Sequence, residues 1–216
     1  MLKKQVDKTH YQFSNYMDKK RWMSMWHQLA EVLLLNPQNV LEVGKGTGLF
    51  KSMAEIFDVT VETVDIDPDL NPDHVASATD LPFKNNSYDC ICAFQILEHL
   101  PYDQSLVAFS EMVRVARKNI IISLPDAKKL WTYSVHIPKI GEVMLHFPRP
   151  QLRPLIHKFD GEHYWEINKL GSPLQKIIDD FTRNNVNILK MYRVPENPYH
   201  RFFVFEKIPR GQNLVG

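Results

Sequence analysis

The segment VLEVGKGTG, residues 40–48, constrains the fold of this chain more than any other segment. A short apolar run with one acid, Glu42, leads directly into glycines at every second position, 44, 46 and 48. Glycine adopts positive φ at little steric cost and lets the backbone approach a ligand closely. Helical periodicity follows from Gly48 to Phe57. The segment therefore predicts a strand, a tight turn that binds a ligand, and a helix.

The spacing of the glycines excludes two common phosphate-binding loops. A P-loop requires Lys-Ser or Lys-Thr after its last glycine, whereas Leu49 follows Gly48. The dinucleotide motif requires a third glycine three residues after its second, and Leu49 occupies that position too. The pattern that remains is E-x-G-x-G-x-G from Glu42 to Gly48.

Strand and helix patterns alternate after this segment. Strands are expected at residues 40–43, 59–64, 75–78, 88–94 and 119–124, and helices at 13–35, 48–57 and 105–116. Such alternation predicts right-handed βαβ units and a mostly parallel sheet in a Rossmann-like three-layer α/β/α sandwich. Only nine residues, two of them prolines, separate Asp65 from Val75, so no full crossover helix fits between these two strands. The N-terminal helix is a candidate to cover that part of the sheet instead.

The C-terminal third predicts the rest of the sheet. Ser172 and Pro173 form a helix start, with Ser172 as the N-cap. Strands at 186–194 and 201–207 are separated by a short turn, which predicts an antiparallel hairpin and a seven-stranded sheet. We expect a single domain over 1–216, with an N-terminal helical segment at 1–36 and an insertion or lid at 127–165.

Asp65 stands at the end of the second expected strand, about 20 residues after the glycines. A carboxylate there can accept hydrogen bonds from both ribose hydroxyls of a nucleoside ligand. An acid at this position binds the ribose of NAD equally well, so Asp65 predicts a ligand with a ribose but does not distinguish between cofactors.

Two further motifs add a family resemblance. Asp80-Leu81-Pro82-Phe83 with Asn86-Ser87-Tyr88-Asp89, and Phe94-Gln95-Ile96-Leu97-Glu98-His99-Leu100, follow the glycine loop in order. Together the motifs resemble class I S-adenosylmethionine (SAM)-dependent methyltransferases of the Methyltransferase-11-like group. The H-Y-W-E segment from residue 163 and the N-P-Y-H-R-F-F segment from residue 197 resemble a bacterial subgroup of it.

The resemblance implies a SAM-binding site, with S-adenosylhomocysteine as the product. Glu42 is expected to order the loop or to meet the ammonium group of SAM, Asp65 the ribose, and the segment around Asp80 the adenine. Ser77 replaces an aspartate common in the group, which shifts the adenine contact toward Thr79 or Asp80. The cofactor-binding candidates are Glu42, Gly44, Lys45, Gly46, Asp65, Ile66, Thr79, Asp80, Leu81, Phe94 and Gln95.

The catalytic candidates are two histidines. An oxygen acceptor must lose a proton, and His99 and His163 are the best-placed bases. His163 lies in the segment 127–165, in which we find no helix or strand periodicity and which we interpret as a long structureless loop. Because loops of this length are often functional, we expect His163, Tyr164 and Trp165 to line the acceptor pocket. Glu98-His99 also resembles the Glu-His pair with which some quinone O-methyltransferases bind a metal, but Gln95 replaces their preceding glutamate. We therefore expect no metal.

Charge and cysteine content narrow the partners. The chain has 26 basic and 25 acidic side chains, a net charge of +1. We therefore expect no nucleic-acid partner and no membrane insertion. Cys90 and Cys92 suit reduced core thiols, and the N-terminus has no apolar signal region, so we expect a cytoplasmic protein.

We expect a SAM-dependent methyltransferase that acts on a small-molecule or glycan acceptor, with oxygen as the attacking atom. A catalytically silent SAM-binding module stays open as an alternative, because the cofactor motif does not require a working base. An NAD-dependent oxidoreductase is disfavoured by the missing third glycine, and an RNA methyltransferase by the balanced charge.

Overall fold

The computed structural model describes residues 13–151, 153–159 and 161–209. The elements before the long segment are α1 (Phe13–Tyr16), α2 (Lys19–Leu35), β1 (Asn39–Val43), α3 (Leu49–Ile56), β2 (Thr60–Asp65), η2 (Pro68–Leu70), β3 (His74–Val75), β4 (Tyr88–Phe94), η3 (Leu97–His99), α4 (Tyr102–Val115) and β5 (Ala116–Pro125). They are followed by β6 (Leu130–Ile137), β7 (Gly141–Pro148), α5 (Leu174–Thr182), β8 (Val186–Arg193) and β9 (His200–Lys207).

Seven strands form one sheet in the order β3-β2-β1-β4-β5-β9-β8. The pairs from β3 to β5 are parallel, whereas β9 pairs antiparallel with both β5 and β8. The expected mostly parallel sheet with a C-terminal antiparallel hairpin is confirmed. Because strand order reverses beside β1, the carboxyl ends of β1 and β4 flank the position where α/β sheets usually bind ligands.

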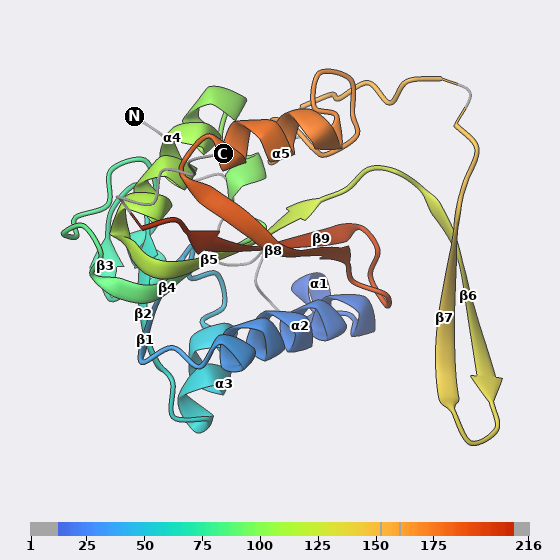
Figure 1. Ribbon diagram of the computed structural model, residues 1–216, viewed down its shortest axis with the longest axis horizontal. Coiled ribbons are helices and arrows are strands. Elements are labelled where there is room, and N and C mark those ends of the chain that lie inside the picture. Colours follow the sequence, from blue (N-terminus) through green and yellow to red (C-terminus); the bar gives the residue numbers. More distant parts are fainter. Residues whose placement is uncertain (1–12, 152, 160, 210–216) are drawn as a thin grey trace.

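Helices cover both faces of the sheet, α2 and α3 on one side and α4 and α5 on the other (Figure 1). The α4 and α5 face holds the larger core, in which Phe109 and Phe181 stack with ring centroids 4.4 Å apart. The α2 and α3 face holds a second core around Val32 and Phe50. The strand side chains in this core alternate along the strands with the side chains that point into the first core. Cys90 and Cys92 are free and buried in this second core, as predicted.

Several boundaries differ from the prediction. The first expected helix is broken at Met17 and Asp18, because the Asp18 carboxylate accepts a hydrogen bond from the Arg21 N–H and caps a new helix. The third strand is reduced to His74 and Val75. Helix α5 begins at Leu174 with Pro173 as the N-cap, so the expected cap at Ser172 is wrong by one position.

The link between β2 and β3 contains only the single turn η2, as its length predicted. The expectation that the N-terminal helix covers this part of the sheet is wrong. Helix α3 packs on β2, while α2 contacts α3 and β5 near the centre of the sheet. The opposite side of the β2 region is covered by Leu81 and Phe83, which pack against the larger core.

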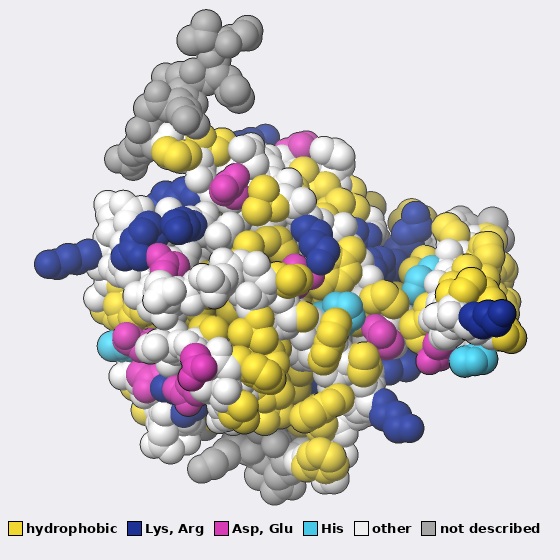
Figure 2. Space-filling view, turned by 60° about the horizontal axis from the view of Figure 1, so that its bottom comes forward, with side chains coloured by type: hydrophobic (Ala, Val, Ile, Leu, Met, Phe, Trp, Pro, Cys, Tyr) yellow, Lys and Arg dark blue, Asp and Glu magenta, His cyan; other side chains and the backbone are white. Residues whose placement is uncertain are grey.

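The segment 127–165 is not a structureless loop, in contrast to the expectation. Strands β6 and β7 pair antiparallel over their whole length, from Leu130 opposite Pro148 to Ile137 opposite Gly141. The hairpin extends away from the sheet (Figure 1). Its side chains are largely exposed, and Figure 2 shows hydrophobic side chains along this protrusion at the right of the view. Apolar and polar residues do alternate along β6, with Trp131, Tyr133, Val135 and Ile137 on one face, so the strand pattern was present in the sequence and was overlooked.

Among the described residues, none of the helices combines the length and the apolar character that a membrane span requires.

Candidate active site

A cavity of about 890 Å³ lies at the carboxyl ends of β1, β2 and β4. The glycine loop, the end of β2 and the residues that follow β4 form its walls. Of the predicted site residues, eight cofactor candidates and both histidines line it: Glu42, Gly44, Lys45, Gly46, Asp65, Ile66, Phe94, Gln95, His99 and His163. Its position agrees with the sheet edge at which α/β folds bind ligands.

The first glycine of the loop cannot be replaced without a clash. Gly44 has φ of +85°, and a Cβ atom there would lie 2.1 Å from Cδ1 of Ile96. Its N–H donates to the Val64 carbonyl at 2.8 Å, which ties the turn to the end of β2. Gly48, with φ of +73°, is the N-cap of α3. The sequence therefore turns sharply here and leaves open backbone at the cavity wall.

Asp65 orders the loop from the end of β2. Its carboxylate accepts hydrogen bonds from the backbone N–H of Lys45 and of Asp67, each at 2.9 Å. Burial raises the pKa of Asp65, while these backbone hydrogen bonds act against the rise. Each carboxylate oxygen can accept more than one hydrogen bond, so Asp65 can hold the loop and still meet a ligand hydroxyl.

Glu42 is a buried acid at the cavity wall, with 4% of its surface exposed. Its Oε2 atom has no hydrogen-bond partner among the described residues. Burial, followed by the nearby charge of Asp65, raises the pKa of Glu42 well above its usual value. A buried acceptor without a donor is costly, so this position favours a ligand that brings a donor or a positive charge.

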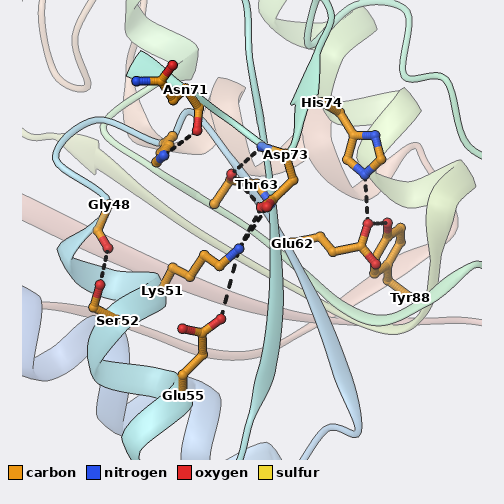
Figure 3. Close-up of polar contacts among 11 residues, drawn as sticks. Gly48, Lys51, Ser52, Glu55, Glu62, Thr63, Asn71, Asp73, His74 and Tyr88 are labelled. Atoms are coloured by element: carbon orange, nitrogen blue, oxygen red, sulfur yellow. Dashed lines mark hydrogen bonds and ion pairs between the residues drawn. The ribbon is translucent and has the colours of Figure 1, made fainter. Parts of the chain in front are cut away.

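Asp73 is a second carboxylate near the glycine loop, and it stabilises the link between β2 and β3. Asp73 accepts hydrogen bonds from Lys51 Nζ and from Thr63 N and Oγ1, each at 2.8 Å (Figure 3). Beside it, the Glu62 carboxylate is bonded to His74 and Tyr88. These contacts fix the short β2–β3 link against α3 and the sheet, in place of a crossover helix.

Thr79, Asp80 and Leu81 are not among the residues that line the cavity. Leu81 is buried in the larger core, where its N–H donates to Glu111 and its carbonyl accepts from Arg114, both at 2.9 Å. The three residues just before them, Ala76, Ser77 and Ala78, line the cavity instead. The Glu111–Arg114 pair on α4 thus holds the D-L-P-F segment against the core and away from the cavity. Sequence periodicity cannot predict this position, because it depends on hydrogen bonds to a distant helix.

His99 and His163 face each other at the other end of the cavity, with ring centroids 5.0 Å apart. His99 Nδ1 lies 3.1 Å from the Glu162 carbonyl, and His163 Nδ1 lies 3.4 Å from Glu166 Oε1. Since a carbonyl or carboxylate can only accept, each Nδ1 carries the proton, and in the neutral ring Nε2 carries the lone pair. The two histidines come from segments 64 positions apart.

A family model described as a methyltransferase domain matches residues 13–160. This range includes the glycine loop, Asp65 and the whole parallel part of the sheet. The chain belongs to the methyltransferase domain family. Together with the fold, this makes it a SAM-dependent methyltransferase. No curated protein sequence matches the methyltransferase.

Solved structures share the fold of the methyltransferase at low sequence identity. The 1,6-didemethyltoxoflavin-N1-methyltransferase of Burkholderia thailandensis, with 1,6-didemethyltoxoflavin and S-adenosylhomocysteine bound, is 11% identical with a TM-score of 0.61, covering 93% of this chain and 85% of that one. Magnesium protoporphyrin IX methyltransferase of Synechocystis PCC 6803, with SAM bound, is 14% identical with a TM-score of 0.53, covering 87% and 79%. The small RNA methyltransferase HEN1 is 12% identical with a TM-score of 0.59, covering 88% of this chain and 26% of that one.

The cavity of the methyltransferase fits SAM. Glu42 offers a buried acceptor without a donor, which the ammonium group of SAM would supply. Gly44, at positive φ and packed against the Ile96 side chain, keeps the backbone of the loop at the cavity wall. Asp65, at the end of β2, lines the cavity beside the loop with a carboxylate that can accept a hydrogen bond from a ligand hydroxyl.

Some lining residues of the methyltransferase were missed from the sequence. Arg21 and Met25 of α2 line the cavity, beside Tyr16 of α1. His200 also lines it; burial, and then the charge of Arg21, lower the pKa of His200 to about 3, so it is neutral. The only signal was the N-P-Y-H segment.

The insertion contributes to the cavity in part. Tyr164 lines it, whereas Trp165 is buried in the core and packs edge-on to Tyr102 with centroids 5.0 Å apart. The expectation that Trp165 lines the pocket is therefore wrong.

Proposed function

We propose that this methyltransferase transfers a methyl group from SAM to an oxygen atom of a small-molecule or glycan acceptor. The observation that carries the proposal is the His99–His163 pair, which lies in the same cavity as the glycine loop. With Nδ1 engaged by Glu162 and by Glu166, each imidazole can act on a hydroxyl through Nε2, and oxygen acceptors need such help to lose a proton.

The chain's own residues hold and orient the reactants. The glycine loop, Glu42 and Asp65 would hold the amino acid end and the ribose of SAM, and residues 76–78 would meet its adenine. SAM supplies a methyl group already activated by its sulfonium. Alignment of the acceptor oxygen with that group is then the main task of the protein, and positioning of this kind is worth up to roughly 7–11 kcal/mol.

The insertion is proposed to cover the acceptor. Phe159, Gly161, His163 and Tyr164 line the cavity, which supports a lid role for the part of residues 127–165 that follows the hairpin. The cytoplasm is the proposed compartment, supported by the two free, buried cysteines.

One alternative is supported by a specific observation. HEN1 shares the fold and acts on small RNA. The net charge of only +1 over the sequence and the size of the cavity favour a small acceptor. Methylation of RNA with no methylation of small hydroxyl compounds would overturn the proposal.

Asp65→Ala tests the cofactor site. Calorimetry with S-adenosylhomocysteine should show binding to the wild-type chain and about 10–100-fold weaker binding to the variant, because hydrogen bonds to a charged acceptor are lost. Asp103→Ala, on α4 and outside the cavity, is the matched control and should bind normally. Near-normal affinity of Asp65→Ala would place the ribose elsewhere.

Mass spectrometry of hydroxyl-bearing metabolites and glycans incubated with SAM tests the reaction. A mass increase of one methyl group, lost without the protein, is expected. Cofactor binding with no product from any acceptor class would favour the silent SAM-binding module. Tight binding of NAD(H) with no response to SAM or S-adenosylhomocysteine would favour an oxidoreductase.

A further inference from the structure

Three metal-ligand side chains converge at the acceptor end of the cavity. Glu98, His99 and His163 each offer one ligand atom, and these atoms lie within 4.8 Å of one another. The ligands of a tetrahedral zinc ion lie roughly 3.4 Å apart, since Zn–N and Zn–O bonds are about 2.0–2.2 Å. A small rotation of the side chains would therefore bring the three atoms onto one ion. In the sequence only Glu98 and His99 are adjacent; the fold adds His163.

Glu98 is the independent sign of a ligand. It is fully buried, and its Oε2 atom has no hydrogen-bond partner among the described residues. With the Gln95 amide oriented so that its oxygen accepts from Leu124 N–H, its nitrogen donates to Glu98 Oε1 at 3.2 Å, which satisfies one oxygen only. A buried carboxylate of this kind is stabilised by a cation beside it.

The two imidazoles are oriented as metal ligands usually are. Histidines that bind metals donate their other ring N–H to a carbonyl or carboxylate, which fixes the tautomer. His99 does so through Nδ1 to the Glu162 carbonyl, and His163 through Nδ1 to the Glu166 carboxylate. Glu166 is itself held by Lys169 at 2.7 Å. With Nδ1 engaged in this way, Nε2 is the ring nitrogen through which each histidine would bind an ion.

We propose that Glu98, His99 and His163 bind one divalent transition-metal ion of the Zn²⁺ type, which binds the acceptor oxygen. Two imidazoles and one carboxylate favour such an ion over Mg²⁺ or Ca²⁺. Three protein ligands leave a position open, and both histidines line the cavity, so that position faces the acceptor. For the role of the ion, this inference rests on the oxygen acceptor of the proposed function, but it replaces the histidine base, because both imidazoles are then ligands of the ion. Binding of the ion does not rest on the proposed function.

The role of the ion follows from its charge. A bound divalent cation lowers the pKa of a hydroxyl on it, so the acceptor proton passes to water without a histidine base. The acceptor oxygen then forms the new C–O bond with its electron pair, and the C–S bond of SAM breaks with its pair left on sulfur. Glu166 is a positioning residue, because it acts on the ion through His163.

Metal binding can be measured without any acceptor. The full chain is stripped with chelator, dialysed and titrated with Zn²⁺ by calorimetry, with Mg²⁺ as comparison and visible absorption of Co²⁺ as a second readout. We expect one Zn²⁺ per chain, no comparable Mg²⁺ site, and Co²⁺ bands of a low-symmetry site. Glu98→Gln and His163→Ala should lose at least about tenfold in affinity, and Glu166→Gln about 10–100-fold.

His136→Ala, on exposed β6, is the control for adventitious histidine binding and should keep wild-type affinity. Binding of S-adenosylhomocysteine by every variant checks that the fold survives. Absence of a Zn²⁺ site in the wild-type chain, or equal affinity in Glu98→Gln, would overturn the proposal.

The two proposals fail separately. Zn²⁺ binding without methylation of any hydroxyl acceptor would leave the metal site and overturn the proposed function. Methylated product formed equally well after chelation would leave the proposed function and overturn the role of the ion in it, and the Zn²⁺ titration decides the site itself.

Discussion

At the scale of single residues, two carboxylates near the glycine loop differ because their partners differ. Glu42 is buried with an oxygen that lacks a donor, and its pKa is raised. Burial also acts to raise the pKa of Asp73, but hydrogen bonds from Lys51 and Thr63 outweigh it and lower that pKa to about 2. The first residue is suited to a ligand, and the second to holding the fold.

Asp73→Asn should lower the free energy of unfolding at pH 7 by roughly 1 kcal/mol, since the side chain is more than a third exposed. The pKa of Asp73 is depressed in the folded chain. Its contribution is therefore complete above the unfolded pKa of about 4 and disappears as pH falls toward 2.

Urea unfolding at pH 7 and at pH 3 measures this difference. The gap between wild type and Asp73→Asn should narrow at pH 3. Asp58→Asn is the matched control, because Asp58 is exposed and its φ of +61° suits asparagine. An equal gap at both pH values would contradict the assignment.

At the scale of elements, the β6–β7 hairpin is separate from the cofactor site. Its two strands contact each other extensively, yet none of its residues lines the large cavity. The cavity is instead lined by the chain that follows the hairpin, up to Tyr164. The N–H of Arg149 donates to the Lys129 carbonyl at 3.1 Å, so the two ends of the hairpin lie side by side.

Replacement of residues 130–148 by a Gly-Ser loop of about four residues should therefore leave the body folded. We expect the thermal midpoint to change by only a few degrees and the affinity for S-adenosylhomocysteine to stay within about twofold. Calorimetry and thermal unfolding of the shortened chain measure both. Loss of cofactor binding would show that the hairpin supports the site.

At the scale of the whole molecule, stability depends on the core between the sheet and α4 with α5. Phe109 is fully buried, stacks on Phe181 and meets Phe205 edge-on at 5.1 Å. Because it joins two helices to the antiparallel part of the sheet, it connects the C-terminal hairpin to the methyltransferase core.

Phe109→Ala should cost about 3–5 kcal/mol of unfolding free energy through lost burial and the cavity left behind. Phe57→Ala, at a side chain 55% exposed, should change it by less than about 0.5 kcal/mol. Chemical denaturation of both variants gives the comparison. A cost near 1 kcal/mol for Phe109→Ala would mean that the core collapses around the gap.

Much of the architecture is predictable from local patterns. Glycines 44, 46 and 48, Asp65 and the strand repeats predict the turn, the cofactor site and the seven-stranded sheet, because each depends on residues close together in the chain. The hairpin at 130–148 could also have been predicted, because apolar residues at 131, 133, 135 and 137 alternate with polar ones, but this pattern was overlooked. The position of Leu81 was missed because Arg114 and Glu111, about 30 positions later, hold it.

The sequence by itself determined the sheet, its sharp loop and the family, since these follow from backbone conformation and alternating burial over short stretches. The tertiary structure decided which side chains share the acceptor end of the cavity. It placed His163 beside Glu98 and His99, across 64 positions, and left Glu98 buried with one oxygen unpaired. Burial and proximity between distant segments create that chemistry, and no local pattern records either of them.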